Sequence, residues 1–150
     1  MTRRVDFYVL GEPTSAGRLR LACRLAEKAY LAGQAVLIWD TDTSELAQLD
    51  ELLWTFADRS FVPHETVLAP AMAPDAPVLL SSGVVPERRL DVLINLAADV
   101  PPCLANVERV ADIIDGDEAR RRAGRARFRA YRDAGLQLET HEISARQLSG

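Results

Sequence analysis

The densest group of charged side chains in this sequence lies near its C-terminus, where seven arginines fall between Arg120 and Arg132. Guanidinium groups form paired hydrogen bonds with carboxylates and phosphates, so such a cluster indicates a site for an anionic partner. A single aromatic residue, Phe128, shares a helical face with several of these arginines when residues are spaced about 100° apart. The pattern predicts an aromatic ring on a cationic surface.

A helix from Asp117 to Leu136 would position this surface. Asp115 or Asp117 can cap its N-terminus, and Gly135 can take the left-handed conformation that often ends a helix. Arginine-rich helices are often only solvated, and Phe128 could then pack under a neighbouring loop. Against this alternative, we expect the core to be contacted by a separate stripe of small residues, namely Ala119, Ala123, Ala126, Ala130 and Ala134.

Two kinds of anionic partner fit an aromatic residue among arginines. Single-stranded nucleic acid would stack its bases on the ring, whereas an acidic peptide with an apolar end would bury that end beside it. The whole chain carries a formal net charge of −4, which would repel a phosphate backbone. We therefore favour the acidic peptide, and direct binding of single-stranded nucleic acid remains the alternative.

No catalytic or cofactor-binding motif is found. The loop after the first expected strand has five residues between Gly11 and Gly17, so it matches neither a P-loop nor a dinucleotide fingerprint. Asp40 and Asp42 follow the second expected strand, and we interpret both as helix-capping residues. His64 and His141 have no neighbouring nucleophile, and Cys23 and Cys103 lack metal-ligand spacing. We expect no cofactor and no metal, and a degenerate nucleotide-binding enzyme is the weakest alternative.

Large aromatic residues mark a second candidate surface. Trp54 and Phe61 flank an irregular segment that follows the second expected helix. Aromatic residues beside such loops are frequent anchors in protein interfaces. The alternative is that both side chains close the core.

The order of strands and helices predicts one α/β domain over residues 1–150, with a mostly parallel sheet flanked by helices. Residues from Ser144 onward are expected to be a frayed tail. The apolar runs indicate strands at Val5–Leu10, Ala35–Trp39, Val78–Ser81, Leu90–Leu96, Val110–Ile114 and Gln137–Ile143. Helical spacing indicates helices at Leu19–Leu31, at 44–56 and, for one short turn, at Cys103–Glu108.

Composition agrees with an ordinary folded protein, since 48% of the residues are hydrophobic and 27% are charged. No apolar run is long enough to suggest a membrane helix or a signal peptide. We expect a cytoplasmic protein that makes no contact with membranes.

Several segments together resemble the chi subunit of bacterial DNA polymerase III. The resemblance covers nearly the whole chain, and its most specific parts are a loop and the arginine-rich helix. The matching segments are FYVL at Phe7–Leu10, GQAVLI at Gly33–Ile38, LDELLW at Leu49–Trp54, SFVPHE at Ser60–Glu65, RRLDVLINL at Arg88–Leu96 and RARFRAYRDAGL at Arg125–Leu136.

The resemblance implies a Rossmann-like domain without catalytic activity that links the clamp-loader complex to single-stranded DNA-binding protein. It implies that the acidic, phenylalanine-ended C-terminal tail of that protein binds at Arg125, Phe128, Arg129 and Arg132. It also implies an interface with the psi subunit at Trp54, Phe61, Val62, Pro63 and His64. The expected assembly is a monomer or a heterodimer, and contact with nucleic acid is expected to be mainly indirect.

Overall fold

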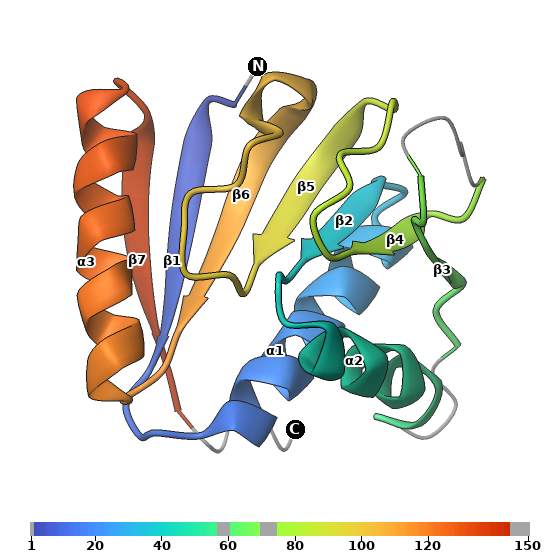
Figure 1. Cartoon of the computed structure of the whole chain (residues 1–150), viewed down its shortest axis with the longest axis horizontal. Coiled ribbons are helices and arrows are strands. Elements are labelled where there is room, and N and C mark those ends of the chain that lie inside the picture. Colours follow the sequence, from blue (N-terminus) through green and yellow to red (C-terminus); the bar gives the residue numbers. More distant parts are fainter. Residues whose placement is uncertain (1, 57–60, 70–74, 145–150) are drawn as a thin grey trace.

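A seven-stranded sheet forms the centre of the protein in a computed structural model, which describes residues 2–56, 61–69 and 75–144 (Figure 1). The strand order is β3-β4-β2-β5-β6-β1-β7, and every neighbouring pair is parallel. The carboxyl ends of all strands therefore meet at one edge of the sheet. The strands are β1 (Arg4–Leu10), β2 (Val36–Trp39), β3 (His64–Thr66), β4 (Val78–Ser81), β5 (Leu90–Asn95), β6 (Val107–Ile114) and β7 (Gln137–Ile143).

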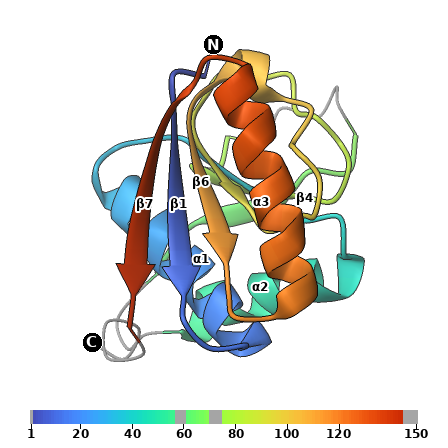
Figure 2. The ribbon, with the colours of Figure 1, turned by 90° about the vertical axis from the view of Figure 1, so that its left-hand side faces the viewer.

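Helices cover the two faces of the sheet unequally. Helices α1 (Ser15–Leu31) and α2 (Thr43–Thr55) lie on one face, whereas α3 (Glu118–Asp133) lies on the other, beside β6, β1 and β7 (Figures 1 and 2). Helix α3 connects β6 to β7 and passes over β1, which lies between these strands. The arginine-rich helix is therefore placed at one end of the sheet, away from α2 and β3.

The core consists of two apolar layers because side chains alternate along each buried strand. In β2, Val36 and Ile38 pack with α1 and α2, while Leu37 and Trp39 belong to the layer on the opposite face. All four residues of this strand are buried. Continuous burial on both faces is expected of central parallel strands and explains the unbroken apolar run in the sequence.

Side chains and glycines fix the ends of the helices. Thr14 accepts a hydrogen bond from the Gly17 backbone N–H at the start of α1, and Asp117 accepts one from Arg120 at the start of α3. Gly135 follows α3 with a φ of 83°, as the sequence predicts. Asp42 caps α2, but Asp40 does not, because its Oδ1 atom accepts from the backbone N–H of Asp42 instead. The capping interpretation of Asp40 was therefore wrong.

Two short elements differ from the prediction. The turn expected at Cys103–Glu108 is a 3-10 helix at Leu104–Asn106, and β6 already begins at Val107. The segment expected to be a loop at Phe61–His64 ends in β3, which extends the sheet by pairing with β4. The expected tail after Ser144 lies outside the described residues.

Candidate functional site

Helix α3 contacts the sheet through a face that the sequence analysis did not identify. The buried residues of this helix are Gly124, Arg127 and Tyr131. The five alanines expected at the core are instead exposed, apart from the half-buried Ala123. The alanine stripe was therefore the wrong choice of packing face, and two of the arginines are structural.

A buried polar cluster replaces the expected alanine contacts. Arg127 is 5% exposed and forms two hydrogen bonds to the carboxylate of Asp112 on β6, each between 2.8 and 2.9 Å. Tyr131 and Asn95 also donate to Asp112, at 3.1 and 3.2 Å. The third guanidinium nitrogen of Arg127 donates to the carbonyl oxygen of Ala98. Because every member has a partner, the charge of Arg127 can be buried under α3.

A second ion pair fixes the N-terminal end of α3. Arg120 donates two hydrogen bonds to Asp115, and the backbone N–H of Thr14 donates a third. Burial alone would raise the pKa of Asp115, but these hydrogen bonds outweigh burial and lower it to about 2. This pair ties the first turn of α3 to the start of α1.

A pocket lies between α3 and the strands β1, β6 and β7, with a volume of about 220 Å³. Apolar atoms from Phe7, Val9 and Ile114 form much of its lining. Gly124 lines it as well, since the absence of a side chain lets the helix approach Ile114 closely. The complete lining of this α3 pocket is Phe7, Val9, Ile114, Arg121, Gly124, Arg125, Phe128 and Thr140.

Phe128 has one face on the core and one toward solvent. Its ring centroid lies 5.4 Å from that of Phe7, and its side chain is 36% exposed. Arg121 and Arg125 line the same pocket from successive turns of α3. Arg125 is exposed, whereas Arg121 is half-buried and donates to the carbonyl oxygen of Gly11 at 3.5 Å. An apolar pocket with two guanidinium groups on its lining can accept a group that is both apolar and anionic.

The four predicted tail-binding residues are not all at this pocket. Arg125 and Phe128 line it, whereas Arg129 and Arg132 are exposed farther along the same helix, where Arg132 lies 3.3 Å from the carboxylate of Asp133. Sequence reasoning missed the contributions of β1, β6 and β7. The helical spacing places Arg121 beside Phe128, but Arg121 was not among the predicted binding residues. Gly124 was the available signal, because glycine inside a helix often marks a close approach.

The predicted aromatic surface lies at the other end of the sheet. Trp54 and Phe61 are 52% and 61% exposed, so they do not simply close the core. The Trp54 ring lies 5.2 Å from Phe61 and 4.7 Å from His64, measured between centroids. Val62 is buried and Pro63 is half-buried. We refer to Trp54, Phe61 and His64 as the aromatic patch.

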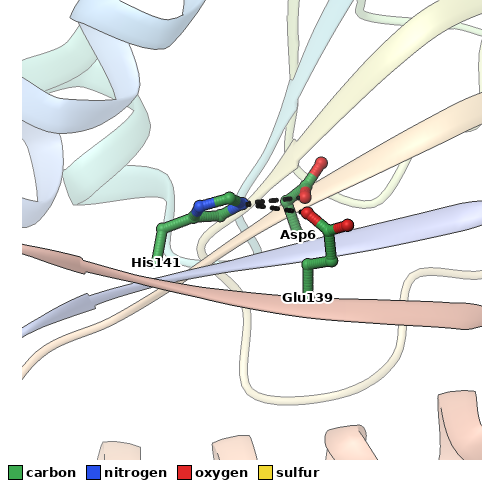
Figure 3. A group of neighbouring side chains, drawn as sticks. All are labelled: Asp6, Glu139 and His141. Carbon is green, nitrogen blue, oxygen red and sulfur yellow. Dashed lines mark hydrogen bonds and ion pairs between the residues drawn. The ribbon is translucent and has the colours of Figure 1, made fainter.

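His141 lies in a charged cluster on the sheet face opposite α3, together with Asp6 and Glu139 (Figure 3). Its Nε2 atom is 2.9 Å from the buried carboxylate of Asp6. Asp6 also accepts hydrogen bonds from Arg4 and Arg109. These bonds already use the Asp6 oxygens, and two guanidinium groups would repel a metal ion, so the cluster is better explained as an ion-pair network across β6, β1 and β7.

The fold and the α3 pocket together define a class of protein, namely a parallel α/β domain with an apolar pocket bordered by arginines of its last helix. The first 139 residues match the family model described as DNA polymerase III chi subunit, HolC. The chain belongs to this family. In the described part of the chain, no helix is both long and apolar enough to cross a membrane.

Curated relatives with the same family name align with this chain over almost their full length. The chain is 39% identical to DNA polymerase III subunit chi of Pseudomonas aeruginosa over 140 residues, covering 93% of this chain and 96% of the relative. It is 30% identical to the Escherichia coli subunit, covering 92% and 97%.

A solved structure shows the same fold. T4 UvsW aligns with a TM-score of 0.66 and 11% sequence identity, over 95% of this chain and 42% of that one.

Proposed function

We propose that this chain is a non-catalytic adaptor of the replicative polymerase that binds the acidic C-terminal tail of single-stranded DNA-binding protein. In this proposal, the last phenylalanine of the tail enters the α3 pocket. Its terminal carboxylate pairs with Arg121 or Arg125, and the preceding acidic residues lie along the exposed arginines of α3. The observation that carries the proposal is the combination of an apolar pocket and guanidinium groups on one helix face.

Size and charge support this occupant. A volume of about 220 Å³ suits one aromatic side chain rather than a folded domain or a stack of bases. Arg122, Arg125, Arg129 and Arg132 are all exposed, so they can pair with carboxylates without first leaving a buried partner. Surface charge pairs are screened by salt, so the affinity should fall as ionic strength rises.

Titration with a synthetic acidic peptide ending in phenylalanine tests this proposal. Phe128→Ala is expected to weaken binding by about 1–2 kcal/mol, because truncation removes the apolar wall that contacts the ring of the peptide. Arg125→Ala should weaken binding by a similar amount. Fluorescence anisotropy of a labelled peptide measures both effects, and Arg89→Ala is the matched control because Arg89 is an exposed arginine that lies outside α3.

Two further ligands separate the proposal from its alternatives. A peptide with an amidated C-terminus should bind more weakly than the free acid, since it lacks the terminal carboxylate. A single-stranded oligonucleotide of equal charge should bind more weakly than the acidic peptide. Tight oligonucleotide binding without peptide binding would show instead that α3 contacts nucleic acid directly. A rise in melting temperature with ATP or a dinucleotide would support the enzyme alternative.

We further propose that the aromatic patch connects the chain to the clamp loader through a psi-like subunit. Exposed aromatic rings in mutual contact are typical anchors of protein interfaces. Trp54 and Phe61 are the exposed members of the patch, whereas the His64 side chain is 1% exposed. Helix α2 ends beside Trp54 and β3 begins at His64, and both elements lie at the end of the sheet opposite α3 (Figure 1). Both partners can therefore bind without competing for the same surface.

Trp54→Ala is expected to weaken capture of the psi-like partner by about 1–2 kcal/mol, because the exposed Trp54 ring contacts both Phe61 and His64 and is central to the patch. Binding of the acidic peptide should stay unchanged in this variant. Co-purification from native lysate measures capture of the psi-like partner, and peptide anisotropy measures binding of the acidic peptide. Both measurements are made on Trp54→Ala and on Phe128→Ala for comparison. Loss of both binding activities in either single variant would contradict the assignment of two independent surfaces.

A further inference from the structure

A second pocket opens at the carboxyl edge of the sheet, and neither proposed interface uses it. Its volume is about 330 Å³. The residues around it come from both faces of the sheet, because α1 and α2 approach it from one side and α3 from the other. Crevices of this kind, at the carboxyl ends of parallel strands, are where open α/β folds bind ligands. The residues of this edge pocket used below are Arg18, Asp40, Asp42, Glu45, Ala119 and Ala123.

Asp40 is a buried carboxylate of this pocket, and the guanidinium group of the nearby Arg18 is paired with Glu45 instead. Asp40 follows β2 and is 2% exposed. Its Oδ1 atom accepts from the backbone N–H of Asp42, but its Oδ2 atom has no hydrogen-bond partner, and no ion pair within the described residues includes it. A buried, unpaired carboxylate oxygen is unfavourable and needs a donor or a positive charge.

The other charged groups around the pocket already have partners. Asp42 accepts the backbone N–H groups that begin α2. Glu45 pairs with Arg18 at 2.8 Å, while Arg120 and Arg127 on α3 pair with Asp115 and Asp112. The excess charge is therefore negative and centred on Asp40. An anionic ligand such as a nucleotide phosphate would be repelled from this place.

We propose that the edge pocket binds an organic cation, an ammonium or guanidinium group carried on an alkyl chain. The cationic group would pair with Asp40 Oδ2, and Ala119 and Ala123 would line the path of the alkyl chain. The same chemistry is supplied by a free polyamine or by a lysine or arginine side chain of a partner protein.

The geometry also implies that a proton competes with this cation. Burial, and then a side-chain hydrogen bond that protonated Asp40 can form with Glu45, raises the pKa of Asp40 to about 7. Asp40 is therefore protonated below pH 7 and offers its negative charge above it. The charged groups around it are Arg18 on α1, Asp42 and Glu45 at the start of α2, and Arg120 and Arg127 on α3. Affinity for the cation should therefore be roughly tenfold lower at pH 6 than at pH 8.

NMR titration of the ¹⁵N-labelled full chain tests this site. The probes are N-acetyl-arginine amide as the side-chain source and spermidine as the free polyamine, with neutral N-acetyl-citrulline amide as the isostere of the first. We expect saturable shifts of the Thr41, Ala97 and Ala98 amides with a cationic probe only. Asp40→Asn should weaken this binding at least tenfold and remove its dependence on pH, whereas Asp75→Asn, an exposed aspartate on another segment, should change neither.

The outcomes distinguish the two possible sources of the cationic group, and they include results that would contradict the proposal. Tighter binding of arginine amide identifies a partner's side chain, and tighter binding of spermidine identifies a free polyamine. Equal binding of the citrulline probe, or unchanged binding by a folded Asp40→Asn protein, would overturn the proposal. Glu45→Gln, which also reduces the negative charge, serves as a second variant if Asp40→Asn does not fold. Binding of Mn²⁺ with line broadening of the same amides, and no binding of either organic cation, would show a metal site instead.

Discussion

Asp112→Ala is expected to lower the free energy of unfolding by about 3–5 kcal/mol, the range observed when one partner of a buried ion pair is removed. The mutation leaves Arg127 buried without its counter-ion and removes the acceptor for the hydroxyl of Tyr131. Burial raises the pKa of Tyr131 and the charge of Asp112 raises it further, so the tyrosine stays neutral and acts only as a donor. Urea denaturation followed by circular dichroism measures the loss.

Asp133→Ala is the matched control for this measurement, because it removes an aspartate from the end of α3, the helix that carries Arg127. Its carboxylate pairs with Arg132 at the surface, where both side chains are more than half exposed. Surface pairs contribute roughly 0–1 kcal/mol, so the control should stay close to wild type. A loss of less than about 1 kcal/mol for Asp112→Ala would show that the buried pair stabilises the fold no more than a surface pair does.

Gly124→Ala is expected to reduce affinity for the acidic peptide by about 10- to 100-fold while changing stability little, a loss of about 1.4–2.7 kcal/mol in binding. The added methyl group would collide with the Cδ1 atom of Ile114, which forms part of the pocket lining. Because that atom is the free end of a side chain, it can rotate, and the pocket then becomes smaller. Alanine is also favoured over glycine in helices by about 1 kcal/mol, which offsets the rearrangement.

Peptide anisotropy and urea denaturation on the same variant separate these two effects. Ala130→Leu is the control, since it adds more bulk to an exposed position of α3 that does not line the pocket. Full peptide affinity in a folded Gly124→Ala protein would show that the phenylalanine of the tail binds elsewhere on α3.

Much of the fold could be predicted because strands and helices leave local signals. Gln137–Ile143 was predicted with the bounds observed for β7, and Gly135 was correctly expected to be left-handed. The packing face of α3 was not predictable in the same way. Small residues usually face a core, but here Arg127 of α3 is buried because it pairs with Asp112 of β6. No pattern within the helix sequence reveals that a strand supplies such a partner.

The candidate site was predictable only in its helical part. Arg125 and Phe128 could be selected because both lie on α3 and their spacing is visible in the sequence. Phe7 and Thr140 join the pocket because β1 and β7 are neighbours, with Phe7 paired to Thr140 in register. That adjacency results from the path of the chain over β1, which the sequence does not display. Asp40 was misread for a related reason, since its surroundings include Arg18 of α1 and Glu45 of α2.

The strand order has a consequence for how two partners would be held. The β3 edge lies near the aromatic patch and the β7 edge lies near the α3 pocket, with seven strands from one edge to the other. At about 4.8 Å between neighbours, this sheet is a rigid spacer of about 29 Å. A domain of fixed width keeps two bound partners apart while holding each within reach of the other. With both proposed partners bound, each would be held at a raised local concentration near the other, because one domain carries both.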